Sequence, residues 1–189
     1  MITLNIQNET GQLEAVILGI ANSFGGTPSL DACYDPKSKE HVKAGTFPTE
    51  ESIIPEMKAV CDVLEKHGVK VYRPKEIEGL NQIFARDIAF VIDDKMVLPN
   101  IIDDRADELK AIQAVIDEID AHQLIKMPQD ARAEGGDVMI WNEYLFIGYS
   151  EEEDFEKYQV ARTNKEGVAF LQTSFPNRKV KAFELKKSD

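Results

Sequence analysis

The sequence predicts an α/β fold built from three consecutive modules, each made of strands and a helix. Apolar runs of strand length alternate with segments in which apolar residues recur at helical spacing. Corresponding strands begin about 49 residues apart, which indicates an internal repeat. Repeats of this kind are typical of radial or stacked architectures, so we expect the modules to be arranged in one of these two ways.

The first module (about residues 1–75) begins with the apolar run Leu13–Ile20, which is typical of a buried strand. Ala21–Pro48 is rich in Gly, Pro, Ser and Asp and is predicted to be a long loop. Thr49 can cap a helix that ends at Gly68, and Val69–Tyr72 is a short strand. The helix carries an apolar stripe that we expect to be buried, formed by Ile53, Ile54, Met57, Val60, Cys61 and Leu64.

The second module (about residues 81–128) has shorter connections. Ile88–Ile92 and Lys95–Leu98 are predicted to form a hairpin around a turn at Asp93-Asp94. A helix is expected to begin near residues 103–104, and Gln123–Met127 is the closing strand. The apolar stripe of this helix consists of Leu109, Ile112, Val115, Ile116 and Ile119.

The third module (about residues 132–186) repeats this order. Val138–Trp141 and Tyr144–Ile147 flank a turn at Asn142-Glu143. A helix is expected from near Asn164 to about residue 173, and Lys179–Leu185 is the closing strand. The chain ends shortly afterwards, without a terminal module that differs from the others.

The chain is acidic, with 22 Lys and Arg against 34 Asp and Glu and a formal net charge of −12. It has no basic run that could neutralise phosphates, which argues against nucleic acid and anionic membranes and favours cationic small molecules as partners. The N-terminus lacks the basic and apolar segments of a signal peptide, and Ala15–Ile20 is too short to span a bilayer. We therefore expect a cytoplasmic protein.

The two cysteines, Cys33 and Cys61, form no C-x-x-C pair and are expected to be free thiols. No base stands near Cys33 in the sequence, so an ordinary thiol is favoured there over a nucleophile. The histidines His41, His67 and His122 are scattered, and no His/Cys pair has the spacing of zinc ligands. The sequence therefore predicts no metal site and no cofactor.

Acidic residues stand directly before two predicted buried strands. Glu134-Gly135-Gly136-Asp137 precedes Val138–Trp141, and Asp87 precedes Ile88–Ile92. Adjacent glycines allow backbone conformations closed to other residues, which can place acids close to a ligand. In a radial arrangement the starts of the strands converge, so we expect Asp87 and Glu134 to face one cavity. The alternative is ordinary turn chemistry with solvated acids.

A cavity with several carboxylates suits a planar guanidinium, whose N–H groups two oxygens can accept in parallel. A hard metal ion such as Mg²⁺ or Ca²⁺ is the competing occupant. The sequence has neither an EF-hand pattern nor a set of closely spaced Asp and Asn ligands, so guanidinium is favoured.

Three pieces of sequence appear in a characteristic order. They are Phe84-Ala85-Arg86-Asp87, then Glu134-Gly135-Gly136-Asp137, then Ile147-Gly148-Tyr149-Ser150 leading to Ala161-Arg162-Thr163-Asn164. Each is weak alone, but with the repeated modules they cover nearly the whole chain. In this combination the chain resembles the guanidino-group-modifying superfamily, which includes arginine and agmatine deiminases, dimethylarginine dimethylaminohydrolases and amidinotransferases.

The resemblance implies an α/β propeller of five ββαβ-type modules with pseudo-fivefold symmetry, of which this chain holds about three. It implies that Asp87 binds the substrate guanidinium, and Phe84 in the same motif is a further substrate-binding candidate. Glu134 would orient a catalytic histidine and contact the guanidinium. Arg162 resembles the arginine that holds the substrate carboxylate in some members. Asp137 is a substrate-binding candidate for which a structural hydrogen-bonding role fits equally well.

Enzymes of this superfamily use a cysteine thiolate that attacks the guanidino carbon, and a histidine that shuttles protons. The amidino group passes to water in the hydrolases and to an amine in the transferases. In the family pattern this histidine lies in the fourth module and the cysteine near the C-terminus, and neither region is present here. His122, Cys33 and Cys61 stand at positions that do not match, and about two modules, roughly 80 to 100 residues, are missing.

We therefore expect residues 1–189 to be a single partial domain, the N-terminal part of such an enzyme and inactive alone. Its expected partners are an arginine-like guanidino substrate and the missing C-terminal part, and a homo-oligomer remains open. The alternative is a non-catalytic binding or interaction protein with the same propeller fold. The sequence does not choose between hydrolysis and transfer. Ala21–Pro48 is a candidate lid, with a mobile surface loop as the alternative.

Overall fold

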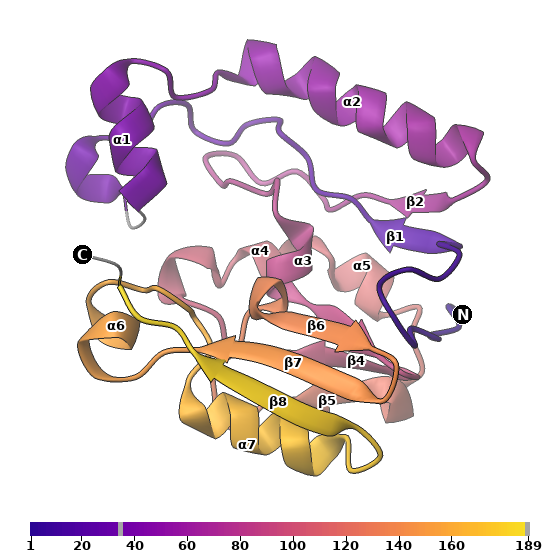
Figure 1. Cartoon of the computed structure of the whole chain (residues 1–189). Helices are drawn as coiled ribbons and strands as arrows, with labels where there is room; N and C mark the ends of the chain where they lie inside the picture. Colours follow the sequence, from indigo (N-terminus) through magenta and orange to yellow (C-terminus); the bar gives the residue numbers. More distant parts are fainter. Residues whose placement is uncertain (34–35, 188–189) are drawn as a thin grey trace. The chain divides into compact units, whose positions relative to one another are not determined.

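The computed structural model describes residues 1–33 and 36–187 of the chain (Figure 1). The chain divides into two compact units. The smaller contains Leu13–Ala85 and Lys110–Ile112, and the larger contains Met1–Gln12, Arg86–Leu109 and the chain from Gln113 onward. The N-terminal segment, which falls within the first predicted module, thus belongs to the same compact unit as the second and third modules.

The smaller unit contains the strand–helix–strand order predicted for the first module. β1 (Ala15–Ile17) and β2 (Lys70–Tyr72) form a parallel sheet of two strands. α2 (Glu50–Lys66) begins where the sequence predicted, because the Thr49 hydroxyl accepts a hydrogen bond of 3.3 Å from the backbone N–H of Ser52. Gly68, with a φ of 78°, follows the helix.

Two expectations for this unit are wrong. The predicted loop Ala21–Pro48 contains η1 (Leu30–Ala32) and the helix α1 (Pro36–Ala44). No residue of α1 is buried, so the helix shows no apolar stripe that sequence periodicity could detect. The stripe of α2 is only half-buried, and Val60 is exposed, because the helix packs on a sheet of just two short strands.

The larger unit contains two sheets with the same topology. In the first, β3 (Phe90–Ile92) pairs antiparallel with β4 (Lys95–Leu98), which pairs parallel with β5 (Leu124–Lys126). The second repeats this arrangement with β6 (Val138–Trp141), β7 (Tyr144–Tyr149) and β8 (Lys179–Glu184). The hairpin turns also match, since Asp93 and Asn142 have φ angles of 55° and 50°. The internal repeat is therefore visible in the pairing of the strands.

The helices of the larger unit agree less well with prediction. α7 (Lys165–Ser174) begins as expected, because the Asn164 side chain accepts a 2.8 Å hydrogen bond from the N–H of Gly167. The long helix expected from residues 103–104 is instead broken into η2 (Asp103–Arg105), α4 (Glu108–Ala111) and α5 (Gln113–Ile116). Aspartates favour helix ends over interiors, and this segment begins with several of them.

Four further short helical turns were not predicted. One of them takes up Ile88, so the following strand begins two residues later than expected. The four turns are α3 (Ala85–Ile88), η3 (Ala121–Gln123), η4 (Gly135–Asp137) and α6 (Glu152–Glu156).

Within the described residues, no helix is long and apolar enough to cross a bilayer.

The hydrophobic core of the larger unit joins its two sheets. One face of the first sheet packs against the strands and the helix of the next module, so the third module covers the second. Figure 1 shows α7 on one side of the sheet formed by β6, β7 and β8. The buried members of this core are Phe90, Ile92, Val97, Met127, Ala131, Ala133, Val138, Ile140, Leu145, Ile147, Leu171 and Phe175.

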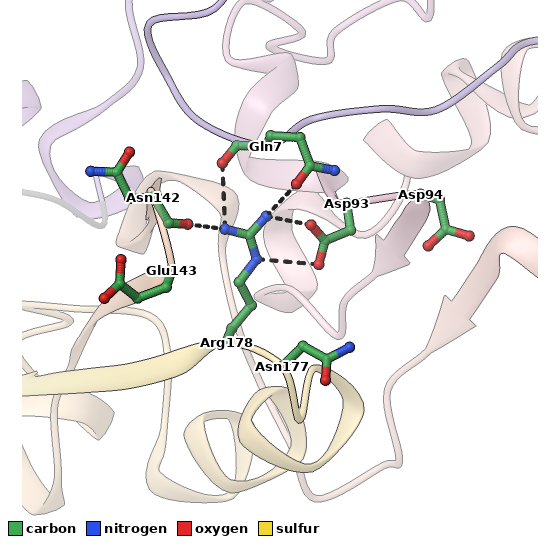
Figure 2. Close-up of a pocket in the computed structure, with 7 residues that line it drawn as sticks. All are labelled: Gln7, Asp93, Asp94, Asn142, Glu143, Asn177 and Arg178. Atoms are coloured by element: carbon green, nitrogen blue, oxygen red, sulfur yellow. Dashed lines mark hydrogen bonds and ion pairs between the residues drawn. The ribbon is translucent and has the colours of Figure 1, made fainter.

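Arg178, between α7 and β8, connects the two hairpin turns to the N-terminal segment (Figure 2). Its guanidinium forms an ion pair with Asp93 at the first turn and donates to the carbonyl of Asn142 at the second. It also donates to the side chain of Gln7 at 3.0 Å. The cavity around it measures about 550 Å³. A single buried side chain thus ties three separate segments together.

We predict that Arg178→Met destabilises the protein by about 2 kcal/mol, because the charged hydrogen bonds to Asp93 are lost. Lys181→Met on exposed β8 is the matched control and should change the stability little. Urea unfolding followed by circular dichroism would measure both. Equal unfolding midpoints for the two variants would show that Arg178 does not hold the turns together.

Candidate functional site

The two acids that sequence analysis singled out lie in equivalent helical turns. Asp87 is in α3, directly before β3, and Glu134 is the N-cap residue of η4, directly before β6. Aligned on the hairpin turns, however, Asp87 corresponds to Gly136 and not to Glu134. The acids therefore occupy different positions of the same turn in the two modules.

The glycine pair of the 134–137 motif allows these two turns to approach closely. A Cβ atom on Gly135 would lie 2.0 Å from the carbonyl oxygen of Arg86, and one on Gly136 would lie 2.7 Å from Oδ1 of Asp87. Neither glycine has a positive φ. The expectation that the pair adopts a conformation closed to other residues is therefore wrong, and the requirement is for space.

The side chain of Arg86 also links these two turns. Its Nε donates to the carbonyl of Gly135 at 3.0 Å, and its Nη2 donates to the carbonyl of Val138 at 2.7 Å. The guanidinium also pairs with Glu9 of the N-terminal segment. The motif of Asp87 and the motif of Glu134 are thus bonded to each other through backbone and side chain.

Both acids reach one buried guanidinium, that of Arg105 in η2. Nη1 of Arg105 donates to Oδ2 of Asp87 at 2.7 Å and lies 3.7 Å from Oε2 of Glu134. Its Nε and Nη2 donate to the two carboxylate oxygens of Glu108 at 2.6 and 2.8 Å. Nothing in the spacing of Arg105 and Glu108 marks them as neighbours of the acid motifs, so the sequence did not predict their part in the cluster.

Arg162 is a second arginine that contacts Glu134. Its Nη1 donates to Oε2 of Glu134 at 2.9 Å. Asp137 accepts hydrogen bonds of 2.9 Å from the Thr163 hydroxyl and from the backbone N–H of Arg162. The N–H of Glu134 in turn donates to the Thr163 hydroxyl at 3.3 Å. Asp137 thus stabilises the loop that carries Arg162 through these hydrogen bonds.

Burial dominates the electrostatics of these acids. It raises the pKa of Glu134 above its ordinary value of 4.5, although the charges of Arg162 and Arg105 oppose the rise. Burial raises the pKa of Glu108 in the same way. Burial also disfavours the charged form of Arg105, but the hydrogen bonds and charges of Glu108 and Asp87 outweigh it and raise the pKa of the guanidinium.

One oxygen of this cluster is left without a partner. Oε1 of Glu134 is buried and accepts no hydrogen bond from any described residue. An unpaired buried carboxylate oxygen is costly, and such atoms are uncommon in native proteins. Oε2, the second carboxylate oxygen of Glu134, accepts a hydrogen bond from Arg162 and lies near Arg105. These contacts fix the direction of Oε1, which can accept an N–H from a ligand or another side chain.

The remaining candidates belong to other parts of the chain. Phe84 belongs to the smaller unit and is 59% exposed, so its part in a site remains a prediction. Cys33 and Cys61, also in the smaller unit, are free thiols as predicted. His122 is exposed in η3. Within residues 1–33 and 36–187, no three His, Cys, Asp or Glu side chains are grouped so that they could hold a metal ion.

Similar solved structures show which fold the chain has. No protein-family model and no curated protein sequence matches the chain. A dimethylarginine dimethylaminohydrolase from Pseudomonas aeruginosa, complexed with citrulline, superposes with a TM-score of 0.71 at 16% identity, over 94% of this chain and 63% of that one. The chain has the fold of these enzymes.

Two amidinotransferases show the same fold. The saxitoxin-pathway amidinotransferase from Microseira wollei matches with a TM-score of 0.70 and 17% identity, over 96% of this chain and 62% of that chain. Inosamine-phosphate amidinotransferase from Streptomyces griseus matches with a TM-score of 0.67 and 17% identity, over 95% and 62%. The chain therefore spans about three-fifths of each neighbour. The predicted resemblance is confirmed for the fold, while the count of five modules remains a prediction.

The two glycines of the motif should respond differently to substitution by alanine. Gly135→Ala places a methyl group against the Arg86 carbonyl and should destabilise the protein by roughly 3 kcal/mol. Gly136→Ala meets only the movable carboxylate of Asp87 and should cost less than about 1.5 kcal/mol. Thermal unfolding of the two variants would test this, and the reverse order would contradict the close approach of the two turns.

Proposed function

We propose that this chain supplies the guanidinium-binding carboxylates of an enzyme that acts on the guanidino group of arginine or of an arginine derivative. The observation that carries the proposal is that Asp87 and Glu134, from two different modules, meet around a buried guanidinium. That guanidinium belongs to Arg105, but its planar fork of donors is the chemistry that an arginine-like ligand brings.

The charge of the cluster also favours a cationic ligand. Among the residues that the structure describes, three carboxylates (Asp87, Glu108 and Glu134) form ion pairs with the two guanidiniums of Arg105 and Arg162. With all groups ionised, the buried cluster thus carries an excess negative charge, and one oxygen of Glu134 is unpartnered. A further guanidinium would neutralise the charge and could donate to that oxygen.

The roles assigned to the residues follow from the resemblance. Asp87 binds the substrate guanidinium, while Glu134 contacts it and orients a catalytic histidine through its free oxygen. Arg162 holds the substrate carboxylate after its own ion pair with Glu134 breaks. Phe84 contacts the substrate. Asp137 keeps Arg162 in place through the backbone.

The chemistry requires groups from outside residues 1–189. A cysteine thiolate attacks the guanidino carbon, and a C–N bond then breaks so that an amine leaves with a proton from a histidine. The resulting Cys-bound amidino group is attacked by water or by an acceptor amine, which gives its proton to the histidine as the C–S bond breaks. A C-terminal part supplies both groups, the protein is cytoplasmic, and this chain alone gives no turnover. The proposed reaction is either hydrolysis or amidino transfer, because the solved neighbours include enzymes of both kinds. The alternative is a non-catalytic binding protein with the same fold.

Titration calorimetry with arginine tests the guanidinium site directly. Asp87→Asn should weaken arginine binding at least about tenfold, because a charged hydrogen bond to the ligand becomes a neutral one. The matched control is Glu143→Gln, an exposed acid at the second hairpin turn, which should leave the affinity unchanged. Unchanged affinity in Asp87→Asn, with a native circular dichroism spectrum, would count against a guanidino site.

The affinity for arginine should rise with pH, since a protonated Glu134 cannot pair with a cation. Because burial raises the pKa of Glu134, the midpoint of this rise should lie above 4.5. Glu134→Gln should weaken binding and flatten the pH profile. An affinity profile that is identical in wild type and Glu134→Gln would exclude Glu134 from the site.

The contribution of Glu134 to the free energy of unfolding has the opposite pH dependence. It is full at low pH and is lost as the pH rises through the raised pKa.

A further inference from the structure

Glu108 is buried in the acid cluster, and the proposed function assigns it no contact with the substrate. It is the first residue of α4 and stands three residues after Arg105, the last residue of η2. Its two carboxylate oxygens accept hydrogen bonds from Nε and Nη2 of Arg105 at 2.6 and 2.8 Å. Both residues are buried. A bidentate pair of this kind fixes the plane of the guanidinium as well as its position.

The pair with Glu108 determines how Arg105 faces the two acids of the site. Nη1 of Arg105 donates to Oδ2 of Asp87 at 2.7 Å and lies 3.7 Å from Oε2 of Glu134. These contacts involve one oxygen of each acid. Oε1 of Glu134 accepts no hydrogen bond from any described residue. Arg105 therefore fixes the direction of both carboxylates, while an oxygen of Glu134 remains available to a ligand.

The guanidinium of Arg105 is also a competitor for a ligand guanidinium. A guanidinium pairs most strongly with a carboxylate through two nitrogens, each donating to one oxygen. Glu108 accepts from two nitrogens of Arg105, so Asp87 receives its hydrogen bond from Nη1. Without the charge of Glu108, we expect Arg105 to turn two nitrogens toward Asp87 and to occupy the place of the ligand.

We propose that Glu108 is a positioning residue of the guanidinium site and acts through Arg105. It holds Arg105 where Nη1 orients Asp87 and Glu134, and it keeps Arg105 from pairing with Asp87 through two nitrogens. Glu108 itself does not touch the ligand. This role rests on the proposed function of Asp87 and Glu134 and adds a residue that acts behind them.

A role limited to balancing the buried charge of Arg105 has different consequences. In that case Glu108→Gln lowers the stability, and removing Arg105 as well does not improve ligand binding. In the positioning role, removing Arg105 from Glu108→Gln takes away the competitor at Asp87 and improves binding. The double variant therefore distinguishes the two roles.

Titration calorimetry of the full chain with arginine and with agmatine, which has the guanidinium but no carboxylate, tests the positioning role. Glu108→Gln keeps the size of the side chain and removes its charge, and it should weaken binding of both ligands at least about fivefold. Adding Arg105→Gln should tighten agmatine binding at least about threefold relative to Glu108→Gln. Glu118→Gln, an exposed acid shortly after α5, is the control and should bind both ligands like the wild type.

A crystal structure of Glu108→Gln gives a readout that needs no ligand. Arg105 should donate to Asp87 through two nitrogens, and an Arg105 that keeps its present contact with Asp87 would overturn the positioning role. If circular dichroism shows that Glu108→Gln does not fold, Glu108→Asp takes its place in both measurements. Its shorter side chain should weaken both ligands in the same way, and an unchanged affinity would again overturn the role.

The calorimetry also separates the positioning role from the proposed function. If Asp87→Asn weakens agmatine binding and Glu108→Gln does not, the positioning role fails and the guanidinium site stands. The role also fails if Glu108→Gln weakens arginine binding alone, because Glu108 then acts at the carboxylate end of the ligand. It fails too if the double variant binds agmatine no better than Glu108→Gln. A wild type that binds neither ligand overturns the proposed function and the positioning role together.

Discussion

The buried guanidinium of Arg105 is the contact on which the centre of the larger unit depends. It joins Asp87 from the start of one sheet to Glu108 on the following segment, and it lies beside Glu134 at the start of the next sheet. Buried carboxylates are tolerated only when their charge is compensated and their oxygens accept hydrogen bonds. Without this arginine the two modules would bring like charges together in a dry environment.

The two modules are fastened by arginine at both ends of their strands. Arg86 bonds the turn before β3 to the backbone of the turn before β6, and Arg178 bonds the hairpin turns at the opposite end. The apolar core that joins the two sheets is the other contact between these modules. Apolar burial is not directional, whereas these hydrogen bonds have fixed geometry. The core therefore supplies cohesion, and the arginines fix the register of one module on the next.

Local signals in the sequence predicted the elements that local interactions determine. Thr49 and Asn164 mark the starts of α2 and α7, and both cap them through side-chain hydrogen bonds. α1 was missed because it buries no residue, and so its sequence has no apolar periodicity. The long helix of the second module was overestimated, because its buried stripe is preserved although the backbone breaks into short turns.

For the candidate site too, the sequence predicted the residues that have local signals and not those that distant contacts bring in. Asp87 and Glu134 could be found because each directly precedes a buried strand, and the repeat predicts that such starts converge. Arg105 and Glu108 could not be found, because their role comes from a contact between segments that no spacing in the sequence records. The role of Gly135 was also hidden, since the space it leaves is filled by the backbone of Arg86, many residues earlier.

Arg105 divides its hydrogen bonds between two carboxylates of the cluster. Nε and Nη2 donate to Glu108, and Nη1 donates to Asp87. A guanidinium bound at Asp87, as proposed, would compete with the hydrogen bond from Nη1, while Nε and Nη2 would still donate to both oxygens of Glu108. A buried guanidinium that loses one carboxylate needs another to balance its charge, and Glu108 supplies it. Glu108 and Asp87 thus hold Arg105 through different nitrogens.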